Sequence, residues 1–214
     1  MVIAFGNTKA GTGKSSLLLL LASYLSSLHH RVYLIEVGDN GALNQFHQRS
    51  KILEHSLPFE YFACGLSGAN LLISRLSAEA ETFILVEFPS EGYNEDIVPL
   101  FLAADLLVIP FCYDVPTLHS SVYFACLSRR IKKGISLLFL PNRVSSRAAH
   151  DLREETDRVL RQIAPVCPGI TEHIGFQRIS SMSLGAAFLK RSLPVLDLIY
   201  HHYLPKQADL NNKS

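Results

Sequence analysis

Short, continuously apolar segments recur along this chain, and longer stretches with a helical spacing of apolar residues lie between them. Uninterrupted runs of valine, isoleucine and leucine are typical of strands that are buried on both faces of a parallel sheet. Five such runs are Val2–Phe5, Arg31–Val37, Thr82–Glu87, 104–111 and 135–140, and a short edge strand is expected at 170–174.

The stretches between these runs predict helices at 15–28, 117–132, 147–163, 183–188 and 195–203. The first of them is rich in leucine nearly all round, which predicts packing on the sheet and against a second surface. Strands that alternate with helices indicate a doubly wound α/β fold, with a mostly parallel sheet covered on both faces. We expect a single domain at residues 1–205 and a polar C-terminal tail at 206–214.

The loop after the first strand reads NTKAGTGKSS, from Asn7 to Ser16. A strand, a tight glycine turn and a helix start place backbone N–H groups and a helix dipole around an anion. Gly11 and Gly13 allow the turn, Lys14 would neutralise phosphate charge, and Ser15 would offer a hydroxyl to Mg²⁺. The alternative is a plain glycine-rich turn with a surface lysine.

At Lys9 to Ser15 the sequence is similar to the deviant Walker A motif, K-G-G-x-G-K-[ST], of the ParA/MinD group of P-loop ATPases. The motif has a lysine at its start, as this chain has Lys9. The likeness continues, in the family's order, over about residues 1 to 200. Its further segments are 35–43, 85–89, 103–110, 140–143 and 174–187.

The resemblance implies a site for ATP and Mg²⁺ and a homodimer in which Lys9 reaches the partner's ATP. It implies catalytic roles for Lys9, Lys14 and Asp39, and metal contacts from Ser15, Glu36 and Glu87. The residues expected to contact the nucleotide are Lys9, Ala10, Gly11, Thr12, Gly13, Lys14, Ser15, Ser16 and, at the adenine, Asn142.

Three acidic positions differ from the family pattern. Glu36 and Glu87 stand where the family has aspartates, and Gly38 stands where the water-orienting aspartate is expected, with Asp39 one residue later. A one-residue slip in an extended segment turns a side chain to the opposite side. We therefore expect ATP binding with slow hydrolysis. The alternative for Glu87 is a solvated, inactive carboxylate at a strand end.

Composition and charge restrict the partners. The chain has 214 residues, 48% hydrophobic and 18% charged, and a net charge of +1, so DNA binding would need a local patch. Arg129, Arg130, Lys132 and Lys133 at a helix end offer such a patch, or are simply solvated. Four scattered cysteines and no visible signal peptide predict a cytoplasmic protein with free thiols. The segment 193–204 is expected to be a closing helix, and not a membrane anchor.

The sequence therefore favours a ParA-like, ATP-dependent dimerising switch in plasmid or chromosome partition, or in a related mobile-element process. By resemblance, its partners would be non-specific DNA and a DNA-binding adaptor protein. Two alternatives stay open. One is a MinD-like positioning or assembly factor that acts on a membrane or secretion complex with little hydrolysis. The other is a small-molecule ligase or kinase with the same fold.

Overall fold

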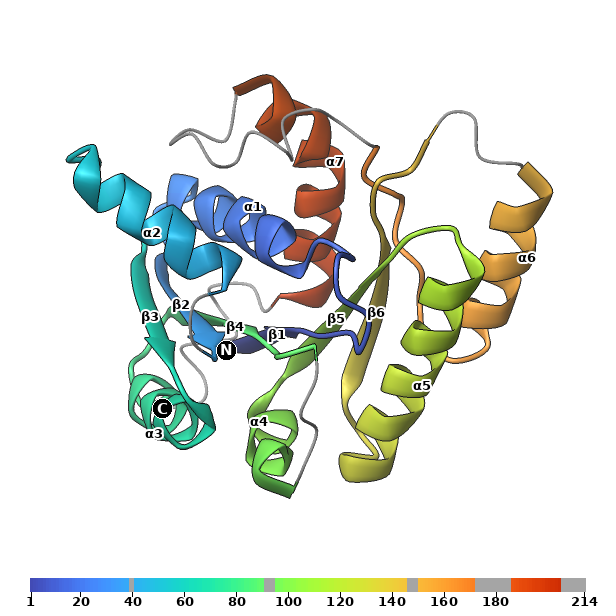
Figure 1. Ribbon diagram of the computed structural model, residues 1–214, viewed down its shortest axis with the longest axis horizontal. Helices are drawn as coiled ribbons and strands as arrows, with labels where there is room; N and C mark the ends of the chain where they lie inside the picture. Colours follow the sequence, from blue (N-terminus) through green and yellow to red (C-terminus); the bar gives the residue numbers. More distant parts are fainter. Residues whose placement is uncertain (39–40, 91–94, 146–149, 172–185, 205–214) are drawn as a thin grey trace.

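The computed structural model describes residues 1–38, 41–90, 95–145, 150–171 and 186–204. Its centre is a six-stranded sheet in the order β3-β2-β4-β1-β5-β6, and every strand pair in the described residues is parallel (Figure 1). The strands are β1 (Val2–Phe5), β2 (Arg31–Val37), β3 (Glu60–Cys64), β4 (Thr82–Glu87), β5 (Leu106–Phe111) and β6 (Ser136–Pro141). The predicted doubly wound fold is confirmed.

Helices cover both faces of the sheet (Figure 1). One face carries α1 (Lys14–Ser27), α2 (Ala42–Ile52) and α7 (Ala186–Tyr203). The other carries α3 (Leu66–Leu76), α4 (Val98–Ala103) after the 3-10 turn η1 (Glu95–Ile97), α5 (Val115–Ile131) and α6 (His150–Arg161). Successive strand residues point to opposite faces, so Ile3 and Phe5 join the first core while Val2 and Ala4 join the second. A strand with two buried faces needs apolar residues throughout, which is the pattern of β1.

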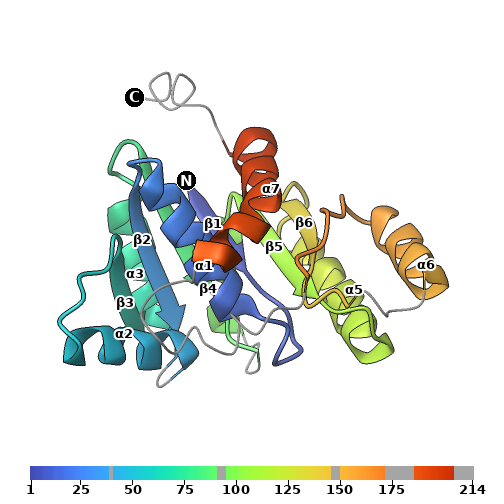
Figure 2. The same ribbon diagram turned by 90° about the horizontal axis from the view of Figure 1, so that it is seen from above.

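The helix α1 packs against the sheet and against α7, which lies beside it on the same face (Figure 2). The Tyr24 hydroxyl donates to Asp197 at 2.5 Å, and the Tyr24 ring meets the Tyr200 ring edge-on. The helices predicted at 183–188 and 195–203 are joined in one helix, since α7 runs from Ala186 through Pro194 to Tyr203. Residues 183–185 lie outside the described residues. Pro194 is exposed, and burial of neighbours such as Val195 and Leu196 stabilises the helix around it. None of the helices in the described ranges is long and apolar enough to cross a bilayer.

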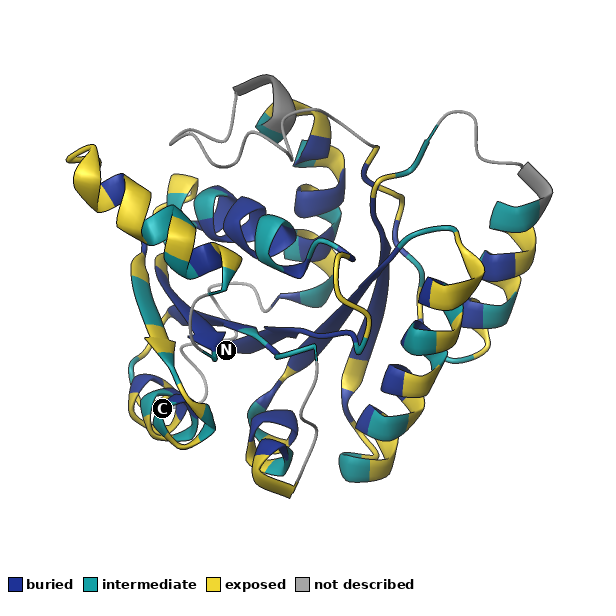
Figure 3. Ribbon diagram, viewed as in Figure 1, coloured by how far each residue is buried: buried dark blue, intermediate teal, exposed yellow. Residues whose placement is uncertain are grey.

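The sequence patterns missed α2, β3, α3 and α4. The strand β3 lies at the sheet edge, where exposed and half-buried residues replace the apolar run, and α2 is mostly exposed (Figure 3). The edge strand expected at 170–174 is represented by an isolated parallel bridge between Val144 and Thr171; residues 172–174 lie outside the described residues. The predicted tail, 206–214, also lies outside them.

The strand register places the acidic residues. Glu87 at the end of β4 is aligned with Phe5 at the end of β1 and with Glu36 near the end of β2. Carboxyl ends of parallel strands share one edge of the sheet, which is where ligands bind in open α/β folds. Both glutamates therefore lie at the edge from which the glycine loop leaves β1.

Candidate phosphate-binding site

The loop between β1 and α1 has the backbone conformation that its glycines allow. Gly11 and Gly13 have φ angles of 78° and 93°, in the left-handed region that favours glycine. Ala10 has no positive φ, so an alanine fits where the family motif has glycine. The turn ends at Gly13, and α1 begins at Lys14 with its first N–H groups facing the loop.

Asn7 holds the start of this loop against β5 and α5. Its side chain is fully buried, and its amide nitrogen donates to the Pro110 carbonyl at 2.9 Å and to the Ser121 hydroxyl at 3.0 Å. Its amide oxygen accepts the backbone N–H of Lys9 at 2.9 Å. The backbone of Lys9 is thereby fixed, while Lys9 as a residue is exposed.

Asn142 holds the end of the loop. It follows β6, is fully buried, and donates from Nδ2 to the Thr12 carbonyl at 2.8 Å. A β-carbon on Gly13 would come within 2.1 Å of that Nδ2 atom, so Gly13 is required by the close approach as well as by its φ. In this structure Asn142 braces the loop, and its contact with adenine stays a prediction.

Lys14 is buried at the mouth of the loop, with 5% of its surface exposed. Its Nζ atom donates to the Asn7 carbonyl at 3.4 Å and to the Ser90 hydroxyl at 2.6 Å. Burial lowers the pKa of Lys14, and the charge of Glu87 opposes this effect. An ammonium group held away from water among short contacts is suited to bind an anion.

Ser15 and Glu87 form a pair beside Lys14. The Ser15 hydroxyl donates to Glu87 Oε1 at 2.7 Å. Burial raises the pKa of Glu87 to about 7, and the charge of Glu36 adds to the rise, while the Ser15 hydrogen bond and Lys14 oppose it. The alternative of a solvated strand-end carboxylate does not describe this pair.

Buried polar atoms without a protein partner gather here. Among the described residues six side-chain atoms are of this kind, and three of them are Thr12 Oγ1, Asn142 Oδ1 and Glu87 Oε2. Such atoms usually mark a missing ligand or water. Mg²⁺ takes one or two protein oxygens and fills its other positions with water and phosphate oxygens, so Ser15 and Glu87 fit this ion. The described residues contain no cluster of three acidic, histidine or cysteine ligands.

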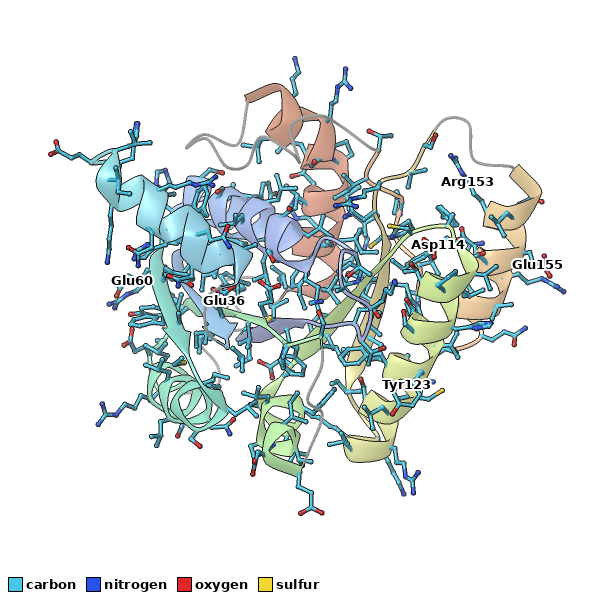
Figure 4. The ribbon with its side chains drawn as sticks, in the orientation of Figure 1. Glu36, Glu60, Asp114, Tyr123, Arg153 and Glu155 are labelled. Atoms are coloured by element: carbon cyan, nitrogen blue, oxygen red, sulfur yellow. The ribbon has the colours of Figure 1, made fainter. Side chains whose placement is uncertain are left out.

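The Glu36 carboxylate forms its hydrogen bonds with the start of α2 and with Tyr61, and not with the Ser15–Glu87 pair (Figure 4). Its carboxylate accepts the backbone N–H groups of Leu43 and Asn44, at 3.3 and 2.8 Å, in the first turn of α2. The Tyr61 hydroxyl on β3 donates to Glu36 Oε2 at 2.5 Å. Since no side chain at Gly41 caps α2, Glu36 stabilises the helix end from the neighbouring strand. Burial and Glu36 raise the pKa of Tyr61, so the phenol stays protonated.

The other residues predicted for the site differ in how far they are buried. Ala10 and Gly11 are exposed in the turn, Thr12 is buried, and Ser16 is half-buried in the first turn of α1. Asp39 lies outside the described residues. Sequence reasoning missed Asn7, Ser90 and Tyr61. Asn7 and Ser90 adjoin predicted motif residues, which was the only available signal.

Removing the charge of Glu87 should make the ligand-free protein more stable at high pH. A carboxyl whose pKa is raised from 4.5 to about 7 on folding costs stability as pH rises through this range, by up to roughly 3 kcal/mol above pH 7. Glu87→Gln removes this cost. Urea unfolding without nucleotide should show a variant close to wild type near pH 4.5 and more stable at pH 8. The exposed Glu155→Gln should show no such difference; equal stability of Glu87→Gln and wild type at pH 8 would contradict the assignment.

Comparison with solved structures shows the same fold in nucleotide-binding proteins. A plasmid partition protein of Borrelia burgdorferi B31 bound to AMPPNP matches with a TM-score of 0.74 and 15% identity, over 92% of this chain and 97% of that one. The septum site-determining protein MinD of Pyrococcus horikoshii complexed with Mg-ADP matches with a TM-score of 0.68 and 16% identity, over 91% and 95%. The pNOB8 ParA protein bound to nonspecific DNA matches with a TM-score of 0.58 and 18% identity, over 75% and 74%.

The comparison with curated proteins gave no match. A family match does cover most of the sequence: residues 3–181 match the CobQ/CobB/MinD/ParA nucleotide binding domain. This span includes the loop, Glu36, Glu87 and Asn142. The chain therefore belongs to the CobQ/CobB/MinD/ParA family of nucleotide-binding domains.

Proposed function

We propose that this chain binds ATP and Mg²⁺ in the loop of residues 7–16 and acts as an ATP-dependent dimerising switch of the ParA type. One observation carries the nucleotide assignment. The buried ammonium of Lys14 lies beside the Ser15–Glu87 pair, whose Glu87 Oε2 atom has no protein partner. A cation, a hydroxyl and a free carboxylate oxygen at a helix start suit a magnesium triphosphate.

Each group in this site has a distinct task in the proposal. The loop amides and Lys14 bind the phosphates, while Ser15 and Glu87 hold the ion, which when bound neutralises phosphate charge. Glu36 contacts the ion only if its carboxylate leaves α2. Because Glu36 is engaged and Asp39 is displaced by one residue from the family position, we propose slow hydrolysis, with Asp39 orienting water.

The cellular process proposed is plasmid or chromosome partition, or a related mobile-element task, in the cytoplasm. It is supported by the fold shared with a plasmid partition protein and with a ParA bound to nonspecific DNA. The partners proposed are a second copy of the chain, non-specific DNA and a DNA-binding adaptor. The engagement of Glu36 also favours the second candidate, a MinD-like assembly factor with little hydrolysis.

The basic cluster at the C-terminal end of α5 is only partly available for DNA. Arg129 donates to the Ile163 carbonyl, and Lys132 donates to the Leu102 and Ala104 carbonyls at 2.9 and 2.8 Å. These two side chains stabilise the packing of α5. Arg130 and Lys133 are exposed, so a DNA surface here would depend on them.

Replacement of the loop lysine should remove nucleotide binding. Lys14→Ala loses a buried charge–phosphate contact, and we expect the Kd for ATP with Mg²⁺ to rise at least about a hundredfold. Isothermal titration calorimetry measures this value, with the exposed Lys51→Ala as control and thermal unfolding to verify the fold. An unchanged affinity in a folded Lys14→Ala variant would rule out the phosphate-loop assignment.

Lys9 should act in the dimer. Its exposed position and fixed backbone leave its side chain free to reach another subunit. Lys9→Ala is expected to keep nucleotide binding within about threefold in the monomer but to lose ATP-dependent dimerisation, as measured by light scattering after size exclusion. Lys190→Ala, an exposed lysine on α7, is the control. ATP-dependent dimers of Lys9→Ala would contradict this role.

DNA binding should require ATP and low salt. Each neutralised phosphate releases counterions, so retention on non-specific DNA should fall steeply between about 50 and 200 mM salt. The double variant Arg130→Ala with Lys133→Ala should weaken retention at every salt concentration and flatten this dependence. Fluorescence anisotropy with a random duplex measures both effects. ATP-independent or salt-insensitive retention would argue against the partition proposal.

A further inference from the structure

Ser90 contacts the loop lysine from a different part of the sheet edge. It follows β4, three residues after Glu87, and its hydroxyl oxygen lies 2.6 Å from Lys14 Nζ. The residue is half-buried. It lies one residue beyond the segment 85–89 and belongs to none of the predicted motifs.

The direction of this hydrogen bond leaves Ser90 with a donor to spare. An ammonium group only donates, so the Ser90 oxygen accepts from Lys14. A serine hydroxyl has two acceptor lone pairs and one proton, and its proton is therefore still available to another acceptor. Lys14 and Ser90 together present two donors that can converge on a single anion.

Ser90 lies on the side of Lys14 where the terminal phosphate is expected. In phosphate loops the turn amides hold the α- and β-phosphates, while the lysine reaches the β- and γ-phosphates. Lys14 Nζ lies between the Asn7 carbonyl, at the loop start, and Ser90 at the end of β4. The β4 end also carries Glu87, which with Ser15 would hold a magnesium ion that neutralises charge on the terminal phosphates.

We propose that Ser90 is a specificity-determining residue that donates its hydroxyl hydrogen to the γ-phosphate, so that the site distinguishes ATP from ADP. This inference rests on the proposed nucleotide binding. In the ligand-free protein the hydroxyl accepts from Lys14 and keeps the ammonium in place. In the bound protein it binds an oxygen that only the triphosphate has.

A purely structural role for Ser90 predicts a different result. If the hydroxyl only positions Lys14, its loss would weaken ADP and the triphosphate alike, because Lys14 also contacts the β-phosphate. If it binds the γ-phosphate, its loss would weaken the triphosphate selectively. The ratio of the two affinities therefore separates the roles.

The experiment measures the Kd of AMPPNP and of ADP, each with Mg²⁺, by isothermal titration calorimetry on wild type and variants. Ser90→Ala should weaken AMPPNP about tenfold, as expected for one hydrogen bond to a charged acceptor, and change ADP less than about twofold. Ser90→Thr, which keeps a hydroxyl, should keep the wild-type ratio within about threefold. The exposed Ser74→Ala on α3 is the matched control and should change neither affinity.

Two outcomes would overturn the inference, and they differ. A parallel loss for both nucleotides in Ser90→Ala, or no change in either, rejects the γ-phosphate contact while leaving nucleotide binding intact. Failure of the folded wild-type protein to bind either nucleotide rejects the proposed function together with the inference. Thermal unfolding of each variant verifies that the comparison is made between folded proteins.

Discussion

The burial of one ammonium group constrains this whole edge of the sheet. Lys14 is placed by the first turn of α1, and its charge is surrounded by the Asn7 carbonyl, the Ser90 hydroxyl and the nearby Glu87 carboxyl. A buried charge is tolerated only with such partners. Asn7, Asn142 and Gly13 fix the loop so that these partners lie within reach, and Asn7 and Asn142 are buried completely.

The two glutamates, similar by sequence, have different surroundings. One oxygen of Glu87 accepts from Ser15 and the other has no hydrogen-bond partner among the described residues. Burial of this carboxyl raises its pKa. Glu36, on the adjacent strand, uses both oxygens to bind the start of α2 and Tyr61. The extra methylene of glutamate relative to aspartate adds reach along the sheet edge toward α2. Of the two acidic positions, Glu87 thus keeps one oxygen without a hydrogen-bond partner among the described residues, while Glu36 caps a helix.

The central strands and the loop could be predicted because local rules decide them. Apolar runs such as Val2–Phe5 have one physical interpretation in a parallel sheet, and a glycine turn before a helix has few alternatives. The edge strand β3 and the exposed helix α2 carry no such pattern. Asn7, Ser90 and Tyr61 act through contacts with residues far away in the sequence. Lys14 and Ser90 are 76 positions apart, and Asn7 and Ser121 are 114 positions apart, so no local spacing reveals these contacts.

The helix α1 is held in place by apolar burial along most of its length. Leu17 to Ala22 are all buried, in the core that α1 shares with the sheet and α7, and the Tyr24 hydroxyl donates to Asp197. Sliding or rotating this helix would disrupt its apolar contacts with the sheet and with α7 at once. The start of α2 is held differently, by the Glu36 carboxylate and, through it, by the Tyr61 hydroxyl, so a small polar cluster and not an apolar interface fixes that helix end.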